Sequence, residues 1–266
     1  MSAEVTQVTG PSTRPARSGR TDEALIAYQG IDKAFGKKVI FENLSLEVRR
    51  GETITVIGGS GSGKSVLLKC LIGLIYPDRG SIMFDGTDVT ELGELEMREV
   101  RRRVAMVFQG SALFDSLSVG ENLAYPLYEQ MPDMTHEEVR EKVALNLKRV
   151  NLPGIEAMKP SDLSGGMKKR VGLARAIATD PEVILWDEPT TGLDPISTRI
   201  IDDLINQMKT ELGCTSIVVT HDMDSAFRVS DRMAMLANRR IVASGTVDQM
   251  QSSEVPEVRA FFDARK

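Results

Sequence analysis

The chain has 266 residues, of which 41% are hydrophobic and 27% charged, and 33 basic against 38 acidic side chains give a formal net charge of -5. These values are ordinary for a globular protein with a substantial core, and the acidic balance argues against a nucleic-acid-binding protein. No apolar run is long enough to cross a bilayer, and the distant cysteines Cys70 and Cys214 indicate neither a metal site nor a disulfide framework. A reducing compartment fits this cysteine usage.

The first segment, residues 1–23, is predicted to be a disordered tail outside the fold. It is rich in Ser, Thr, Pro and Arg and lacks the apolar core of a signal peptide. Because Arg14, Arg17 and Arg20 face a single acidic residue before Asp22, a transit peptide is the less favoured alternative.

Short β-like runs then predict a small antiparallel sheet. Two of them, at 25–28 and 44–48, flank a Gly-Lys-Lys turn at 36–38, and a third lies at 81–84. Phe35 stands at the edge of the turn, where it either fills the core or stacks on an adenine ring, and its spacing alone favours the core.

The glycine-rich stretch 58–65 follows a β-branched run at 52–57 and precedes an apolar helix at 66–74. Strand, glycine loop and helix form the context of a phosphate cradle, since backbone N-H groups can surround phosphate oxygens there and the helix dipole points at the same anion. Lys64 would reach the β and γ phosphates and Ser65 would hold Mg2+, whereas a ligand-free glycine turn is disfavoured by the flanking elements. The predicted nucleotide contacts are Gly58, Gly59, Ser60, Gly61, Ser62, Gly63, Lys64, Ser65 and Val66.

From about residue 111 to 179 the pattern becomes mostly helical, which predicts a subdomain inserted into an α/β core. A Thr-His-Glu-Glu capping box at 135–138 begins one helix, and Pro153 ends it. A second helix is predicted to start after Ser164 and to cover 167–179.

The core pattern then resumes with a continuous apolar strand at 183–186, of the kind that is buried on both faces of a parallel sheet. A helix with an apolar stripe from 200 to 212 follows, and further strands are predicted at 215–220, 233–236 and 241–243.

Two carboxylates, Asp187 and Glu188, follow the strand at 183–186. If that strand lies beside the cradle strand, Asp187 would reach the Mg2+ held by Ser65. Because successive strand residues point to opposite sides, Glu188 would be left free to polarise a water for attack on the γ phosphate. The alternative, a pair of surface carboxylates, is disfavoured by the apolar run that precedes them.

Gln109 and His221 also end apolar strands, at 103–108 and 215–220, where an open α/β sheet binds its ligand. An amide there can sense Mg2+ and water, and an imidazole can hydrogen-bond a γ phosphate. Either residue alone is better explained as a satisfied polar strand end, but their joint occurrence favours a ligand site.

The chain resembles the ATP-binding-cassette ATPase subunits of transporters over residues 25–246. The resemblance rests on the cradle, Gln109, Leu163-Ser164-Gly165-Gly166, the stretch 183–188, Gly192-Leu193-Asp194 and Thr220-His221, in that order and spacing. It implies an α/β fold: a P-loop NTPase core of RecA-like type, with an N-terminal antiparallel β subdomain and an inserted helical subdomain. The implied cassette domain covers 24–250, and a helical tail covers 251–266.

The resemblance also implies ATP and Mg2+ as cofactors and an ATPase activity coupled to transport. It assigns catalytic roles to Glu188, His221 and Lys64, and metal contacts to Ser65, Gln109 and Asp187. Phe35 resembles the adenine-stacking aromatic of the family, which reverses the preference drawn from spacing. Ser164, Gly165 and Gly166 resemble the signature segment, and Asp194 the residue that touches the opposite protomer, because cradle and signature meet only across a head-to-tail dimer in this family.

Within the family the chain looks most like the ATPase of MCE-associated, Mla-type phospholipid transporters. Met167 stands where cassettes usually carry Gln, and the stretches 112–127 and 241–246 are similar to that subclass. The implied partners are a second copy of the chain, a membrane permease, an MCE-domain lipid-binding protein and a small regulatory subunit, at the cytoplasmic face of the bacterial inner membrane and with no nucleic acid. The general cassette form of 190–194 leaves an amino-acid or osmolyte importer as the alternative.

A soluble cassette protein that remodels nucleic acid or ribosomes is a further alternative. Such proteins usually carry two cassettes or a long coiled coil, and this acidic chain has neither. The permease is expected to dock near 108–117 with Phe114 as the anchor. Before this segment, Arg98, Arg101, Arg102 and Arg103 form a basic run. Glutamates alternate with these arginines, which favours a solvated face over contact with anionic lipid.

Overall fold

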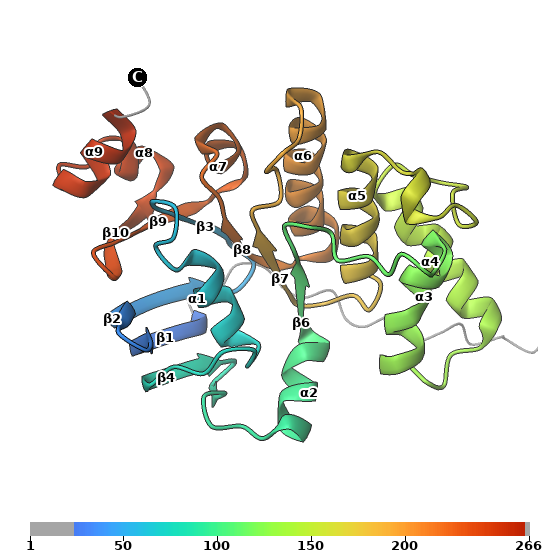
Figure 1. Ribbon diagram of the computed structural model, residues 1–266, viewed down its shortest axis with the longest axis horizontal. Coiled ribbons are helices and arrows are strands. Elements are labelled where there is room, and N and C mark those ends of the chain that lie inside the picture. Colours follow the sequence, from blue (N-terminus) through green and yellow to red (C-terminus); the bar gives the residue numbers. More distant parts are fainter. Residues whose placement is uncertain (1–23, 264–266) are drawn as a thin grey trace, which may run out of the picture.

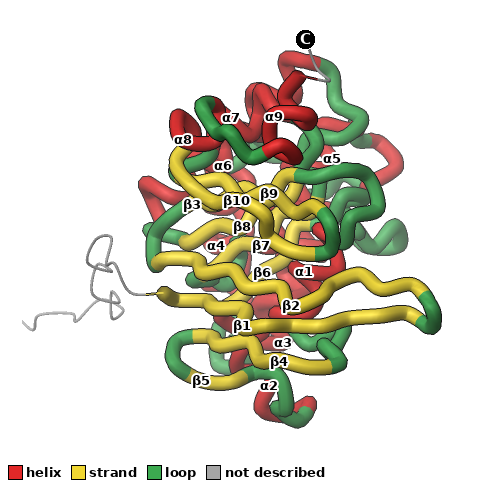
Figure 2. The backbone as a smooth tube through the Cα atoms, turned by 90° about the vertical axis from the view of Figure 1, so that its left-hand side faces the viewer, coloured by secondary structure: helices red, strands yellow, loops and turns green. Residues whose placement is uncertain are grey.

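The computed structural model describes residues 24–263, beginning with two long antiparallel strands. These strands, β1 (Ala24–Phe35) and β2 (Lys38–Arg49), pair with each other, and β4 (Arg79–Phe84) and β5 (Thr87–Asp88) extend the sheet in the order β2-β1-β4-β5. Figure 2 shows the long strands of this sheet running side by side. The predicted N-terminal antiparallel sheet is confirmed.

A second sheet forms the centre of the fold in the order β10-β9-β3-β8-β7-β6. The strands from β9 to β6 run parallel, and only β10 pairs antiparallel, with β9. This mixed α/β core confirms the predicted fold class. Its strands are β3 (Thr53–Ile57), β6 (Val104–Val107), β7 (Val183–Asp187), β8 (Thr215–Val219), β9 (Arg232–Ala237) and β10 (Arg240–Thr246).

Alternate residues of β7 pack into two different hydrophobic clusters. Val183 and Leu185 join the cluster that contains β1, β2 and helix α1 (Lys64–Leu71). Ile184 and Trp186 join the cluster formed with the helices beyond the opposite face. The strand is therefore buried on both faces, as its continuous apolar run predicts. Cys70 and Cys214 lie in different clusters, which excludes a disulfide between them.

Helices α3 (Val119–Gln130), α4 (His136–Arg149) and α5 (Gly165–Ala176) pack against one another beyond β6, with a short 3-10 turn at Pro160–Asp162. Figure 1 shows α3 and α4 at the end of the molecule opposite the antiparallel sheet. The capping box that begins α4 is present, because Thr135 and Glu138 bond each other's backbone N-H groups. The helix ends at Arg149, before Pro153, because Asn151 takes a left-handed conformation with φ of 56°.

Three local differences from the sequence-based elements have backbone causes. Helix α1 stops at Leu71 because Gly73 is left-handed with φ of 65°. The stretch 110–118 is not helical, since Ser111 and Ala112 also have positive φ, and α3 begins only after it. A third difference lies earlier in the chain, at α2 (Glu94–Arg103), which the sequence analysis did not predict. Most of its residues are charged, and only Met97 and Val100 form a short apolar stripe.

The basic run lies on α2, where three of its four arginines form ion pairs with acidic neighbours. Arg103 bonds Asp85 at 2.5 Å and Glu182 at 2.7 Å, and Arg50 binds the same two carboxylates. Two further pairs join Arg101 to Glu94 and Arg102 to Glu99. This pairing agrees with the solvated-face interpretation. It also ties the antiparallel sheet, which carries Asp85, to the start of β7.

The remaining helices are α6 (Pro195–Leu212), α7 (Met223–Val229), α8 (Val247–Gln251) and α9 (Pro256–Asp263). The C-terminal helices begin at Val247, inside the predicted cassette boundary of residue 250. Residues 1–23 and 264–266, which hold the predicted N-terminal tail and the last residues of the C-terminal tail, lie outside the described residues. Within 24–263, no helix combines the length and apolar character that a membrane span needs.

Candidate functional site

The loop between β3 and α1 takes a shape that excludes larger residues at two glycines. At Gly58 an added Cβ would lie 2.3 Å from the carbonyl oxygen of Leu236, which is backbone and cannot yield. At Gly63, with φ of 107°, a Cβ would lie 2.6 Å from Ile40 Cγ2 and 2.8 Å from Phe41 Cε1. Only glycine therefore fits at these two positions, and the backbone of the loop carries no side chain there, as a phosphate cradle requires.

Gly63→Ala is expected to destabilise the protein by about 3 kcal/mol, because the left-handed backbone and the overpacked Ile40 and Phe41 side chains add their costs. Thermal unfolding of the purified chain measures this loss. The matched control is Gly59→Ala, since Gly59 has ordinary φ and open space where the Cβ would go. Equal melting temperatures for the two variants would contradict the prediction.

Lys64, the first residue of α1, folds back over the loop that precedes it. Its ammonium donates to the carbonyl oxygens of Gly58 at 3.0 Å and Gly59 at 3.1 Å, and lies 4.0 Å from Glu188 Oε1. Burial lowers the pKa of Lys64, and the carboxylates of Glu188 and Asp187 oppose that shift. The result is a preplaced cation at the centre of the loop.

Ser65 and Asp187 meet, but not through neighbouring strands. The prediction that the strand ending in Asp187 lies beside the cradle strand is wrong, because β8 stands between β3 and β7. Helix α1 contacts both β7 and β8, and Ser65 Oγ thereby reaches Asp187 Oδ1 at 2.6 Å. A hydroxyl and a carboxylate side by side are the hard oxygen ligands that suit Mg2+.

Glu188 lies just past the end of β7, in a left-handed conformation with φ of 50°. The alternation rule of a strand therefore does not govern its direction, and both Asp187 and Glu188 face the loop of Lys64. Glu188 Oε2 bonds His221 Nδ1 at 2.7 Å and accepts from the His221 backbone N-H at 3.3 Å and from Thr191 Oγ1 at 3.1 Å. A carboxylate held this firmly beside a phosphate cradle is well placed to orient a water.

A cavity of about 510 Å³ joins the loop to residues from four other parts of the chain. Its walls include Phe35, Gln109, Glu188 and His221, so the structure brings together these predicted residues. Phe35 is 48% exposed, and the core position that its spacing favours is wrong. The same cavity is lined by Ser60, Gly61, Gly63, Lys64, Ser65 and Val66. Lys38, Ile40 and Thr191 also line it, and the sequence analysis did not assign these three to the site.

The Ser62 hydroxyl also fits a phosphate ligand. Its Oγ is buried and has no hydrogen-bond partner among residues 24–263. A buried orphan hydroxyl is uncommon, and a phosphate oxygen would satisfy it. The cradle, the hydroxyl and the Ser65–Asp187 pair therefore match a nucleotide with its magnesium ion.

Of the other predicted residues, Gly58, Gly59, Ser62 and Asp187 belong to the loop and the Ser65 pair described above without lining the cavity, and the residues of two helix starts lie elsewhere. Ser164 caps α5 by accepting from Met167 N at 3.2 Å, and Gly165 and Gly166 form the first turn of that helix. Asp194 caps α6 by accepting from the backbone N-H groups of residues 196 and 197. Within a single chain these helix starts do not complete the site.

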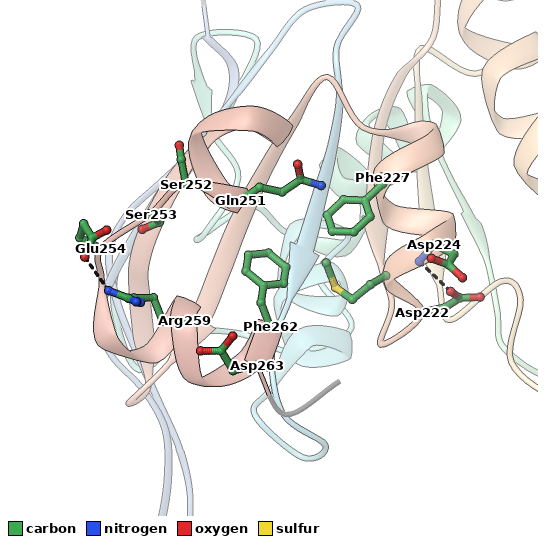
Figure 3. A pocket seen from close by; sticks show the side chains of 11 residues that line it. Asp222, Asp224, Phe227, Gln251, Ser252, Ser253, Glu254, Arg259, Phe262 and Asp263 are labelled. Carbon is green, nitrogen blue, oxygen red and sulfur yellow. Dashed lines mark hydrogen bonds and ion pairs between the residues drawn. The ribbon is translucent and has the colours of Figure 1, made fainter. Parts of the chain in front are cut away.

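A larger cavity, of about 680 Å³, lies between α7 and the C-terminal helices (Figure 3). Phe227 and Phe262 face each other there with ring centroids 6.0 Å apart, and Glu254 binds Arg259 at 2.6 Å on its rim. None of the predicted nucleotide or catalytic residues lines it. The residues predicted to bind nucleotide therefore gather at the smaller cavity and not at the larger one.

Comparison with known proteins agrees with this geometry. Residues 41–191 match the family described as ABC transporter. The intermembrane phospholipid transport system ATP-binding protein MlaF of Haemophilus influenzae is 40% identical over 241 residues, which cover 91% of each chain. The probable ribonucleotide transport ATP-binding protein mkl of Mycobacterium leprae is 41% identical over 91% of this chain and 69% of its own.

Among solved structures, the ATP-binding cassette MJ0796, as a dimer in a post-hydrolysis state bound to ADP and Pi, superposes with a TM-score of 0.77. It is 31% identical and covers 84% of this chain and 98% of its own. The similarity thus extends over most of both chains and includes a nucleotide-bound dimer.

Proposed function

Because this chain belongs to the ABC transporter family and is one of its ATPases, we propose that it powers the movement of phospholipid or a related lipid through a partner permease. ABC ATPases bind ATP with Mg2+, dimerise and work with membrane permeases. The lipid assignment is carried by one observation: the similarity to a phospholipid transport protein, MlaF, covers 91% of both chains. An amino-acid or osmolyte importer has no such support.

In this proposal the catalytic residues act around the γ phosphate. Glu188 is the base that polarises the attacking water, because its carboxylate lies 4.0 Å from the Lys64 ammonium at the cavity wall. Lys64 neutralises charge on the β and γ phosphates. His221 fixes the direction of Glu188 through their 2.7 Å contact and hydrogen-bonds the γ phosphate.

The remaining cavity residues hold the nucleotide. Phe35 stacks on adenine, for which its exposed ring is available. Ser65 and Asp187 would hold Mg2+, with Gln109 near it, and the ion would offset negative charge on the phosphates. The backbone N-H groups of Gly58 to Ser65, with the start of α1, bind the phosphate oxygens.

The site is completed by a second copy in a head-to-tail dimer. Ser164, Gly165 and Gly166 of each copy face the nucleotide in the partner's cradle, since a hydroxyl and two glycine amides at a helix start form an anion site. Asp194 contacts the opposite copy beside that nucleotide. The location of these residues outside their own cavity supports this arrangement. Hydrolysis then opens the dimer, and that opening drives the permease.

The permease docks at the surface around Phe114. Phe114 is 44% exposed, and its ring lies 5.3 Å from that of Tyr125, which is 48% exposed. The buried side chain of Asn122 fixes the loop by accepting from Phe114 N at 2.9 Å and donating to Phe114 O at 3.1 Å. A fixed pair of exposed aromatic rings suits a hydrophobic anchor.

Phe114→Ser is expected to weaken permease binding about tenfold or more, because one aromatic anchor commonly contributes that much. Co-purification of the membrane subunits measures this loss, while basal ATP hydrolysis by the isolated chain is retained. Leu145→Ser is the matched control, since Leu145 on α4 is 49% exposed and lies outside the aromatic pair. Equal recovery of permease with both variants would contradict the docking surface.

The chain is proposed to bind peripherally at the cytoplasmic face of the bacterial inner membrane, with an MCE-domain lipid-binding protein and a small regulatory subunit in the same assembly. Affinity purification of the tagged chain from native membranes, followed by identification of bound subunits and lipids, tests the whole proposal. Recovery of a multispanning permease with phospholipid supports it. Recovery of a solute-binding importer complex, of ribosomes or of DNA would overturn the lipid assignment.

A further inference from the structure

Lys169, in the second turn of α5, joins that helix to the loop that follows Glu188. Its ammonium donates to the carbonyl oxygens of Pro189 at 2.9 Å and Thr191 at 2.7 Å. The side chain is partly buried, and no carboxylate among residues 24–263 forms an ion pair with it. Two directional bonds to backbone oxygens fix the path of the loop, which an ordinary surface lysine would not do.

The same loop holds the carboxylate of Glu188. Thr191 donates from its hydroxyl to Glu188 Oε2 at 3.1 Å and from its backbone N-H to the Glu188 carbonyl at 3.3 Å. A continuous path of hydrogen bonds therefore runs from Lys169 through Thr191 to Glu188. Burial lowers the pKa of Lys169 and Glu188 opposes that shift, which is consistent with an ammonium close to this carboxylate.

A second contact binds the start of α5 to the same segment. A Cβ on Gly166 would lie 3.0 Å from Ser197 Oγ, so the helix start packs closely on the first turn of α6. Ser197 in turn donates its hydroxyl to Asp194 at 2.6 Å. The first two turns of α5 thus contact the segment from Glu188 to Ser197 in two places: through the hydrogen bonds of Lys169 and through close packing of Gly166 on Ser197.

We propose that Lys169 is a positioning residue that couples the two ATP sites of the dimer. The inference rests on the head-to-tail dimer described above, in which the start of α5 faces the partner's nucleotide while Glu188 faces the chain's own. When α5 closes on the partner's ATP, Lys169 carries that movement to the Pro189–Thr191 backbone and thus sets the direction of Glu188. Each site then becomes competent only when the other is occupied.

The test measures ATP hydrolysis against MgATP concentration, using the full chain in complex with its co-purified membrane subunits. Lys169→Met keeps the length of the side chain and removes the donors, and is expected to lower kcat about tenfold or more, because a small displacement of the base is costly. The Hill coefficient should fall from above 1 toward 1, and the Kd for a fluorescent ATP analogue should stay within about twofold. Lys169→Arg should restore most of both parameters, since its guanidinium can donate to both carbonyls.

Lys168→Met is the matched control, because the neighbouring side chain makes no hydrogen bond or ion pair with the described residues. A Lys169→Met enzyme with the parent kcat and Hill coefficient would overturn the inference, as would a parent Hill coefficient of 1. Joint loss of ATP binding and thermal stability would indicate a merely structural lysine. Failure of the Glu188→Gln chain to dimerise with ATP would overturn the dimer itself, whereas a dimer with an unaffected Lys169→Met variant would overturn only the coupling.

Discussion

The Glu188→Gln chain is expected to bind ATP, to hydrolyse it about a hundredfold or more slowly, and to accumulate as an ATP-bound dimer. The amide retains the size of the carboxylate and can still bond Thr191 and His221, but it cannot take a proton from water. Because the nucleotide then persists between two copies, the interface stays closed. Steady-state phosphate release and size-exclusion chromatography with MgATP measure the two effects.

The control for this prediction is Glu211→Gln, an equal change at an exposed position on α6. That variant should hydrolyse ATP at the parent rate and remain free to dissociate. Parent turnover in the Glu188→Gln chain would show that another group serves as the base. Slow turnover without a trapped dimer would separate the catalytic role of Glu188 from the proposed dimer switch.

Lys64→Ala is expected to weaken ATP binding about ten- to a hundredfold and to abolish transport together with it, because a hydrogen-bonded cation beside the phosphates contributes about 1.5–3 kcal/mol. The change also frees the carbonyl oxygens of Gly58 and Gly59, which Lys64 holds at 3.0 and 3.1 Å. Equilibrium binding of a fluorescent ATP analogue gives the affinity, and lipid movement in reconstituted membranes gives the transport.

Lys69→Ala is the control for that change, since Lys69 lies on the same helix but does not line the nucleotide cavity. It should bind ATP with parent affinity. Normal transport by the Lys64→Ala complex would show that transport does not depend on ATP hydrolysis at this cradle. Normal binding with lost transport would instead limit Lys64 to catalysis.

Local sequence patterns predicted most elements of the core and the polar residues at the strand ends that line the cavity. The run at 183–186 is apolar at every position, which only a strand buried on both faces accommodates, and β7 is such a strand. Gln109 and His221 were placed by a general property of parallel sheets, whose ligands bind at the carboxyl ends of the strands. Both residues line the cavity.

The order of the strands could not be predicted in the same way. The strands β7 and β8 are both buried at every position, so neither sequence indicates which strand lies beside β3. Packing over the whole sheet decides the order. The direction of the Glu188 side chain could not be predicted from the sequence either, because its positive φ depends on the turn that follows β7. Lys169 has no motif of its own, and the role of Thr191 within 190–194 was not predicted; only their contacts reveal both roles.

The two oxygens of Glu188 are chemically unlike each other. Oε2 contacts the Thr191 hydroxyl, the backbone N-H of His221 and the imidazole Nδ1 of His221, whereas Oε1 lies 4.0 Å from the Lys64 ammonium. In the proposed mechanism Oε2 holds the carboxylate in place and Oε1 is the oxygen left to accept a proton. If Glu188 is the base, as proposed, a proton taken from water would arrive at Oε1, away from the imidazole, and His221 would position the carboxylate rather than pass the proton on.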